Sequence, residues 1–165
     1  MSGWAPYEIG RNIILAYTNG LSAYRETKIR TASQGQLIIM LYDEAIKQLD
    51  SSLEHLQQYK DASEGKNDPG RIEKSGKAII KAQEIITELM VSLDFEKGQE
   101  IAQHLFSLYS WFNQELLEAN IGQDIRRILI VRNMMNELRS AWNEIVGKTE
   151  VENAGNPPSG VNIAG

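Results

Sequence analysis

The stretch TASQGQLIIMLYDEAI, from Thr31 to Ile46, predicts the start of a long helix and raises the main question about the fold. Ser33 can cap this helix, and Gln36 completes a capping-box pattern in which each side chain binds the other residue's backbone N–H. Six consecutive apolar or aromatic residues follow, from Leu37 to Tyr42. A helix on a small core needs apolar residues only at spacings of three and four, so something must cover the others.

The composition limits the class of protein. The chain has 165 residues, of which 42% are hydrophobic and 24% are charged, and this fits one domain with a core of its own. The formal net charge of −5 argues against a nucleic-acid partner, because no cationic surface would attract a polyanion. The chain has no cysteine, which excludes disulfides, thiolate metal ligands and a cysteine nucleophile.

Neither a signal peptide nor a membrane span is predicted. The stretch IILAY, at residues 13–17, is too short for the apolar core of a signal peptide and lacks the following cleavage pattern. No stretch approaches the roughly twenty apolar residues that a membrane-spanning helix needs. We therefore expect a cytoplasmic protein that does not insert into a membrane.

Four helices are predicted from apolar residues at spacings of three and four. The first is expected over residues 34–59 and the second over residues 71–93, while the third begins after Gly98 and the fourth after Gly122. Long helices with short connections favour an all-α fold, an antiparallel four-helix bundle. The residues expected to fill the core from the last three helices are Ile72, Ile79, Ala82, Ile86, Leu89, Leu93, Ile101, Leu105, Leu108, Phe112, Leu116, Ile128, Val131, Met135, Leu138 and Trp142.

The two ends of the chain lack sustained periodicity. A leader over residues 1–30 has apolar residues interrupted by glycines, and it fits either a flap over an apolar groove or a fixed part of the fold. The polar stretch DASEGKNDPG, residues 61–70, is the clearest loop. We expect residues 1–146 to form a single domain, leader included, and residues 147–165 to form a disordered tail.

Several apolar residues lie away from the predicted core stripes. At about 100° per residue, the apolar arc on the first helix is about 200° wide, whereas one core usually needs nearer about 100°. A thick or asymmetric core, or a homodimer, would explain this surplus. A groove that receives an apolar helix of a partner would explain it equally well. The off-stripe residues on the third and fourth helices are Phe106, Leu117, Ile125, Leu129 and Ile130.

The residues that catalysis would need are missing. A di-iron bundle requires Glu-x-x-His pairs, but Ser52 stands three residues before His55 and Ile101 three residues before His104. A histidine phosphotransfer domain usually has a lysine three residues after its histidine, and Gln58 stands there after His55. We expect no enzyme, no cofactor and no metal site. A homodimeric structural bundle or a phosphotransfer bundle remains the alternative.

Several segments resemble the flagellin-specific secretion chaperones, the FliS family. Residues 23–46, AYRETKIRTASQGQLIIMLYDEAI, are similar to the family's opening: a tyrosine in a short leader, then T-A-S-P-x-x-L, then M-L-Y-D. SLDFEKGQEIAQHLFSLYSWF at residues 92–112 and LLEAN at residues 116–120 resemble its middle and third helix. LRSAW at residues 138–142 resembles its last helix, so the resemblance runs in consistent order over roughly residues 23–146.

The chain departs from this pattern at a few positions. Gln34 replaces the usual proline at the first helical position, Glu44 replaces a small residue, and His104 stands where asparagine is frequent. The leader is also longer than usual. By the same resemblance, Asp94 is expected to cap the third helix and Asn120 to stop it. Arg139 and Trp142 are expected to anchor the fourth helix, although Trp142 fits a place in the groove as well.

The resemblance implies a function. Family members are antiparallel four-helix bundles that bind the disordered C-terminal region of flagellin in apolar grooves, prevent its polymerisation and present it to the export apparatus. The implied partners are one flagellin C-terminal segment per chain, the flagellar export gate and other flagellar regulators. Tyr24 and Ile29 match the leader that is expected to cover the groove. The implied groove residues are Leu37, Leu41, Tyr42, Ile46, Phe106, Tyr109, Leu117, Ile125 and Leu129.

Overall fold

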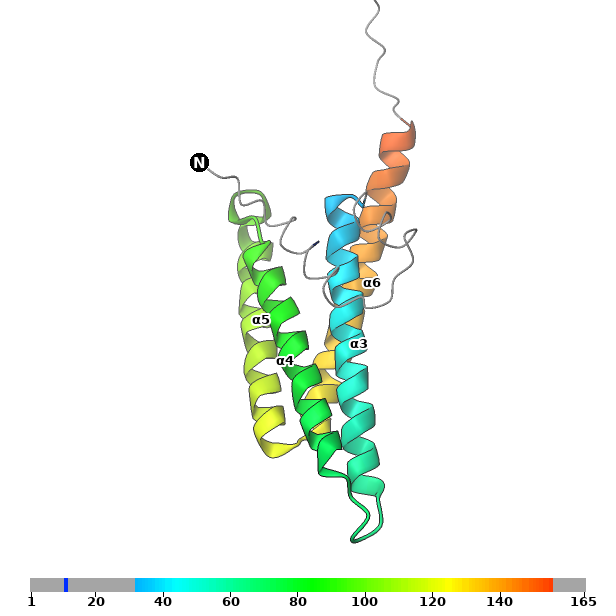
Figure 1. Ribbon diagram of the computed structural model, residues 1–165. Coiled ribbons are helices and arrows are strands. Elements are labelled where there is room, and N and C mark those ends of the chain that lie inside the picture. Colours follow the sequence, from blue (N-terminus) through cyan, green and yellow to red (C-terminus); the bar gives the residue numbers. More distant parts are fainter. Residues whose placement is uncertain (1–10, 12–31, 156–165) are drawn as a thin grey trace, which may run out of the picture.

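The computed structural model describes residue 11 and residues 32–155, and these form a bundle of four helices. The helices are α3 (Gln34–Asp61), α4 (Pro69–Val91), α5 (Phe95–Gly122) and α6 (Ile125–Gly155). Figure 1 shows successive helices running in opposite directions and joined by short connections. No strand occurs in this part of the chain, so the predicted all-α four-helix fold is confirmed.

The helices pack around a closed ring. α3 packs against α4 and α6, and α5 packs against the same two helices, so α3 and α5 stand at opposite corners. α3 buries a wide arc against its two neighbours, and the buried residues include Leu37, Leu41 and Tyr42. Ile38 and Met40 are partly buried against the same core. The apolar run on the first helix therefore serves mainly the core, in agreement with the thick-core interpretation.

The helix starts follow the predicted capping chemistry. The Gln36 backbone N–H donates to Ser33 Oγ at 3.3 Å, and the Ser33 N–H donates to Gln36 Oε1 at 3.1 Å. Asp94 caps α5 by accepting, at 3.0 Å each, the backbone N–H groups two and three residues later. Both side chains satisfy donors that a helix start leaves without an intrahelical partner. The predicted capping box and the predicted role of Asp94 are confirmed.

The predicted helix ends need two corrections. Asn120 does not stop α5, which continues to Gly122 and ends at Gln123 in a left-handed conformation (φ 51°). Instead, Asn120 lies against α4, where its Oδ1 would be 3.1 Å from a Cβ atom placed on Gly76. A side chain held between two helices is not free to cap its own.

The disorder predicted from Gly147 is wrong for residues 147–155, which continue α6. Two contacts with the first turn of α3 help to hold this last part of the helix. Gln36 Nε2 donates to Glu150 Oε1 at 2.6 Å, and Val146 lies so close to Gly35 that a Cβ atom there would be 2.7 Å from it. Residues 156–165 lie outside the described part of the chain.

The predicted core stripe of α5 is also partly wrong. Ile101 is 70% exposed, and Leu105 is only partly buried. The buried positions are Ala102, Tyr109, Phe112, Leu116 and Ala119. Observed and predicted stripes agree at the C-terminal half and differ toward the start, where the backbone at Gln99 leaves helical geometry (φ 43°, ψ −120°).

Candidate partner-binding surface

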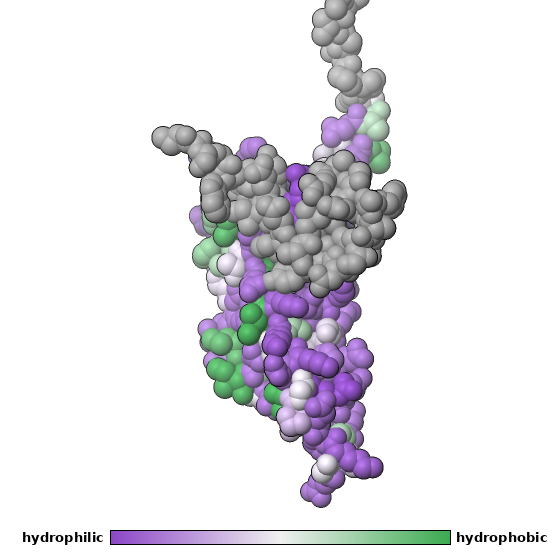
Figure 2. Space-filling model, viewed as in Figure 1, coloured by the Kyte–Doolittle hydropathy of each residue, from purple (hydrophilic) through white to green (hydrophobic). Residues whose placement is uncertain are grey.

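Large apolar side chains remain exposed on three of the four helices. Phe106 and Leu117 on α5 are 43% and 46% exposed, and Leu129 on α6 is 41% exposed. Figure 2 shows apolar surface gathered over α4 and α5, whereas the surface over α3 is mostly hydrophilic. The exposed large apolar residues in the described part of the chain are Ile80, Val91, Phe95, Ile101, Phe106, Trp111, Leu117, Ile121, Leu129, Ile130, Ile145 and Val151.

A shallow depression of about 560 Å³ runs between α4 and α5 on this side. Ile80 on α4 and Leu117 on α5 form its apolar walls. Between them, Asn113 Nδ2 donates to Thr87 Oγ1 at 3.1 Å, which fixes the two helices to each other without covering the apolar walls. Phe106 lies on the same stripe of α5, because it precedes Leu117 by three helical turns. We call this surface the α4–α5 face, defined by Ile80, Phe106, Asn113 and Leu117.

Leu129 belongs to a different surface. It precedes Arg132 by three residues, and Arg132 pairs with Asp50 of α3 at 2.8 Å, so both lie on the side of α6 toward α3. Ile125 lies one turn earlier on that side and is partly buried against the core. Four of the five predicted off-stripe residues therefore divide between opposite edges of the bundle, with Phe106 and Leu117 on one edge and Ile125 and Leu129 on the other. A segment that contacts both edges must wrap around the bundle.

Five of the nine predicted groove residues lie in the core instead of on a surface. Each is at most 9% exposed, so contact with a partner would require its side chain to leave the core. These residues are Leu37, Leu41, Tyr42, Ile46 and Tyr109. The predicted leader residues Tyr24 and Ile29 lie outside the described residues.

Sequence reasoning missed the α4 side of the depression. Ile80 is 49% exposed, although no off-stripe residue was predicted on this helix. The helical period does place Ile80 away from the core stripe, about 100° around the helix from the buried Ile79. The sequence of α4 does not say, however, which helix packs on that side, so the exposure of Ile80 could not be predicted from it.

A buried polar contact crosses the bundle between α3 and α5. The hydroxyl groups of Tyr42 and Tyr109 form a hydrogen bond, and their ring centroids are 6.4 Å apart. The Trp142 side chain of α6 lies near this pair, and its interaction with each hydroxyl lowers the pKa of that tyrosine by less than burial raises it. Burial raises the pKa of Tyr42 and that of Tyr109 above the ordinary value of 10.0, so both hydroxyls stay protonated.

Tyr109 and Trp142 also line a small cavity of about 200 Å³ near the N-terminal ends of α3 and α5. All four helices contribute to it, with Ile38 from α3 and Leu89 from α4 among the lining residues. We call it the N-end pocket. The exposed Ile101 stands at its edge.

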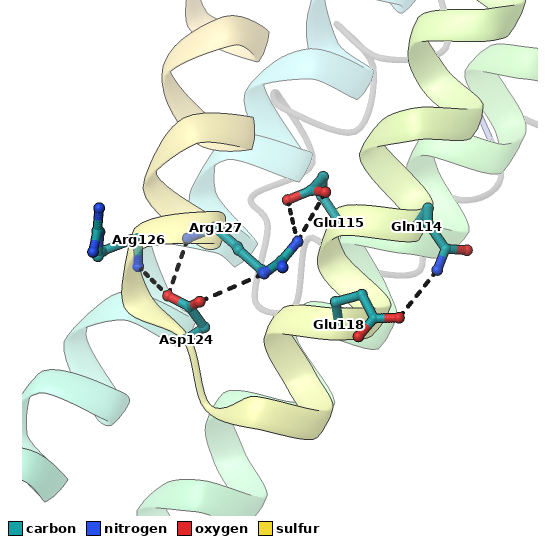
Figure 3. Close-up of polar contacts among 6 residues, drawn as sticks. All are labelled: Gln114, Glu115, Glu118, Asp124, Arg126 and Arg127. Atoms are coloured by element: carbon teal, nitrogen blue, oxygen red, sulfur yellow. Dashed lines mark hydrogen bonds and ion pairs between the residues drawn. The ribbon is translucent and has the colours of Figure 1, made fainter.

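Ion pairs fix α6 to both of its neighbours. Arg127 Nη1 donates to both carboxylate oxygens of Glu115 on α5, at 2.9 and 2.8 Å, as Figure 3 shows. Asp124, in the connection before α6, lies 3.5 Å from the same guanidinium. On the other side, Arg139 pairs with Asp43 of α3 at 2.6 Å, which agrees with its expected role as an anchor of the fourth helix.

In the described part of the chain, histidines occur on α3 and α5, and acidic side chains occur on all four helices. No cluster of three or more potential ligands is close enough there to hold a metal ion. His55 is half-buried, and its Nδ1 lies 3.4 Å from the Arg71 guanidinium. None of the helices described here is long and apolar enough to cross a membrane.

Comparison with known proteins decides the family. A profile described as "Flagellar protein FliS" matches residues 17–149, a range that includes α3, α4, α5 and most of α6. This chain belongs to the FliS family. The FliS region therefore contains both the α4–α5 face and the N-end pocket, while residues 1–16 precede it.

Curated FliS relatives resemble the chain over most of its length. The flagellar secretion chaperone FliS of Salmonella typhimurium is 33% identical over 139 residues, which cover 81% of this chain and 95% of that protein. FliS of Escherichia coli is 33% identical over 120 residues, covering 72% of this chain and 80% of the relative. FliS of Bacillus subtilis is 26% identical over 132 residues, covering 80% and 90%. These relatives are named chaperones, which is not an enzymatic role.

Proposed function

We propose that this protein is a cytoplasmic export chaperone for flagellin. It binds the disordered C-terminal region of flagellin in apolar grooves, one segment per chain, prevents premature polymerisation and delivers flagellin to the flagellar export gate. The observation that carries the proposal is the α4–α5 face, where Phe106 and Leu117 are more than 40% exposed in a family of secretion chaperones.

Physical chemistry supports the need for such a chaperone before export. A segment that later packs between flagellin subunits needs an apolar stripe, and that stripe favours aggregation unless it is covered before export. When a disordered segment binds, the free-energy cost of ordering it offsets part of the favourable binding free energy. A long apolar contact can therefore be specific and still release its cargo.

Two surfaces are proposed to receive the segment. The α4–α5 face supplies Phe106, Leu117 and, in addition, Ile80. The opposite edge of the bundle supplies Leu129 with the partly buried Ile125. We propose that the five core residues of the predicted groove act by holding α3 and α5 in place. The role of Tyr24 and Ile29 as a cover for the groove stays part of the proposal.

Titration with a flagellin C-terminal peptide tests the proposal. Calorimetry should give one peptide per chain, and circular dichroism of the mixture should show more helix than the sum of the components. Leu117→Glu should weaken binding at least about tenfold. Val151→Glu is the matched control, because Val151 is 73% exposed on the far end of α6 and should leave binding unchanged.

Two results would contradict the chaperone proposal. One is the absence of any complex with the peptide. The other is a stable homodimer that buries the α4–α5 face and takes up no peptide, which would support the structural alternative. Sedimentation of the protein with and without peptide distinguishes the two.

A further inference from the structure

The N-end pocket is an apolar site separate from the α4–α5 face. Its volume of about 200 Å³ lies between Ile38, Leu89, Leu105 and Trp142, one from each helix. An apolar cavity of about 150 Å³ is large enough to hold benzene, so this pocket has room for one aromatic or branched side chain. It is too small for most ligands of drug size, which occupy pockets of about 300 Å³ or more.

Three polar groups that line the pocket already have hydrogen-bond partners: the hydroxyls of Tyr109 and Ser92 and the carboxylate of Asp94. The hydroxyl of Tyr109, a residue that lines the pocket, already forms a hydrogen bond with the Tyr42 hydroxyl. The Asp94 carboxylate at the mouth accepts two backbone N–H groups of α5. An apolar side chain can therefore enter without leaving one of these groups unsatisfied, and such a loss would otherwise oppose binding.

The mouth of the pocket has a distinct charge. Residues 92–102 carry three carboxylates, those of Asp94, Glu96 and Glu100, and a single cation, Lys97. Asp94 lines the pocket itself, and Glu96 and Glu100 are exposed in the same segment, between residues that line the pocket. Complementary charges across an interface favour the matching partner and discourage an acidic one. The mouth thus favours an apolar side chain that has Lys or Arg close to it in sequence.

We propose that the N-end pocket holds one large apolar side chain of the flagellin C-terminal segment, next to a Lys or Arg that faces the acidic mouth. This inference rests on the proposed function and extends it, because it assigns the anchoring pocket and the residue types that it selects. Ile101, which is 70% exposed at the edge, is then a contact residue, and this explains an apolar side chain left in water.

Trp142 provides a direct signal for occupancy. The chain has three tryptophans, Trp4, Trp111 and Trp142, so Trp4→Phe with Trp111→Phe leaves the pocket residue as the single emitter. Titration of this variant with the flagellin C-terminal peptide should shift the Trp142 emission along the same curve as binding measured by calorimetry. Unchanged emission at saturation would overturn the inference.

A matched pair of substitutions gives the second measurement. Ile101→Glu should weaken peptide binding about tenfold or more, because it adds charge and removes an apolar contact at the pocket. Ile130→Glu should change binding less than about twofold, since Ile130 is 48% exposed but lines none of the described pockets. Circular dichroism checks that both variants fold.

Peptide variants identify the anchor and separate the two proposals. An alanine scan of the peptide should find one apolar position whose loss is not additive with Ile101→Glu, and replacing the adjacent Lys or Arg by Gln should also weaken binding. Equal effects of Ile101→Glu and Ile130→Glu, in a protein that still binds the peptide, would overturn the pocket and leave the proposed function intact. No binding by the unsubstituted protein would overturn both.

Discussion

Tyr42 and Tyr109 join opposite corners of the bundle through their hydroxyl groups, in surroundings that are otherwise apolar. Tyr42→Phe removes the hydrogen-bond partner of the buried Tyr109 hydroxyl and should cost about 1–3 kcal/mol of unfolding free energy. The double variant Tyr42→Phe/Tyr109→Phe removes both hydroxyls and should be less destabilised than the sum of the single variants. Urea denaturation of the three variants measures this coupling, and strict additivity would contradict it.

The same pair predicts how stability depends on pH. Burial raises the folded-state pKa of both hydroxyls above the ordinary value of 10.0. Their contribution is therefore fully present below pH 10.0 and is lost progressively as the pH rises toward the folded-state pKa values. Urea denaturation at steps of about one pH unit, from about pH 9 to about pH 11, measures the unfolding free energy. This free energy should fall more steeply with pH for the natural protein than for Tyr42→Phe/Tyr109→Phe. Parallel curves would mean that other groups dominate.

Single apolar residues differ in what they contribute to folding. Leu116 is fully buried, so Leu116→Ala should cost about 2–5 kcal/mol of unfolding free energy. Leu129 is 41% exposed, and Leu129→Ala should cost clearly less while weakening flagellin-peptide binding. Leu105, which the sequence predicts to lie in the core, is only partly buried, so Leu116 is the more suitable core residue for this comparison. If Leu129→Ala destabilised the fold as strongly and left peptide affinity unchanged, Leu129 would be a core residue.

At the scale of the helices, Gln99 marks the least regular position. Its φ of 43° is uncommon for a residue with a side chain, and such positions cost of order 1–3 kcal/mol. Gln99→Gly should therefore stabilise the fold, because glycine adopts positive φ without this cost. Gln103→Gly is the control: Gln103 is exposed in the regular part of α5 and should lose about 1 kcal/mol. Thermal denaturation compares the two, and equal destabilisation would argue against strain at Gln99.

The sequence predicts the helices better than their surfaces, for identifiable reasons. Ser33 and Asp94 allow two helix starts to be predicted, because capping depends on residues only two or three positions away. The end of α6 was missed because its last turns depend partly on Gly35 and Gln36, more than a hundred residues earlier. Likewise, the burial of Tyr42 depends on which helices flank α3, and apolar periodicity does not contain that information.

At the scale of the whole molecule, the bundle fills its core and still leaves apolar surface along opposite edges. α3 packs against α4 and α6, and so does α5. The α4–α5 face and the edge between α3 and α6, which carries Leu129, therefore lie on opposite sides of the bundle. A compact partner would cover only one of them. An extended segment that gains helix where it meets each surface can cover both, and this is the form of partner that the proposed function requires.

Removal of residues 1–24 tests how the leader relates to that surface. The remaining chain keeps all four helices of the described bundle and the complete capping box at Ser33, so it should fold cooperatively. If the leader covers a groove in the free protein, its removal eliminates an intramolecular competitor, and flagellin peptide should bind more tightly or faster. Stopped-flow mixing of truncated and full-length protein with peptide measures the association rate, and calorimetry measures the affinity. Loss of binding in a truncated protein that still folds would mean that Tyr24 and its neighbours contact the cargo directly, because a competing cover can only weaken binding while it is present.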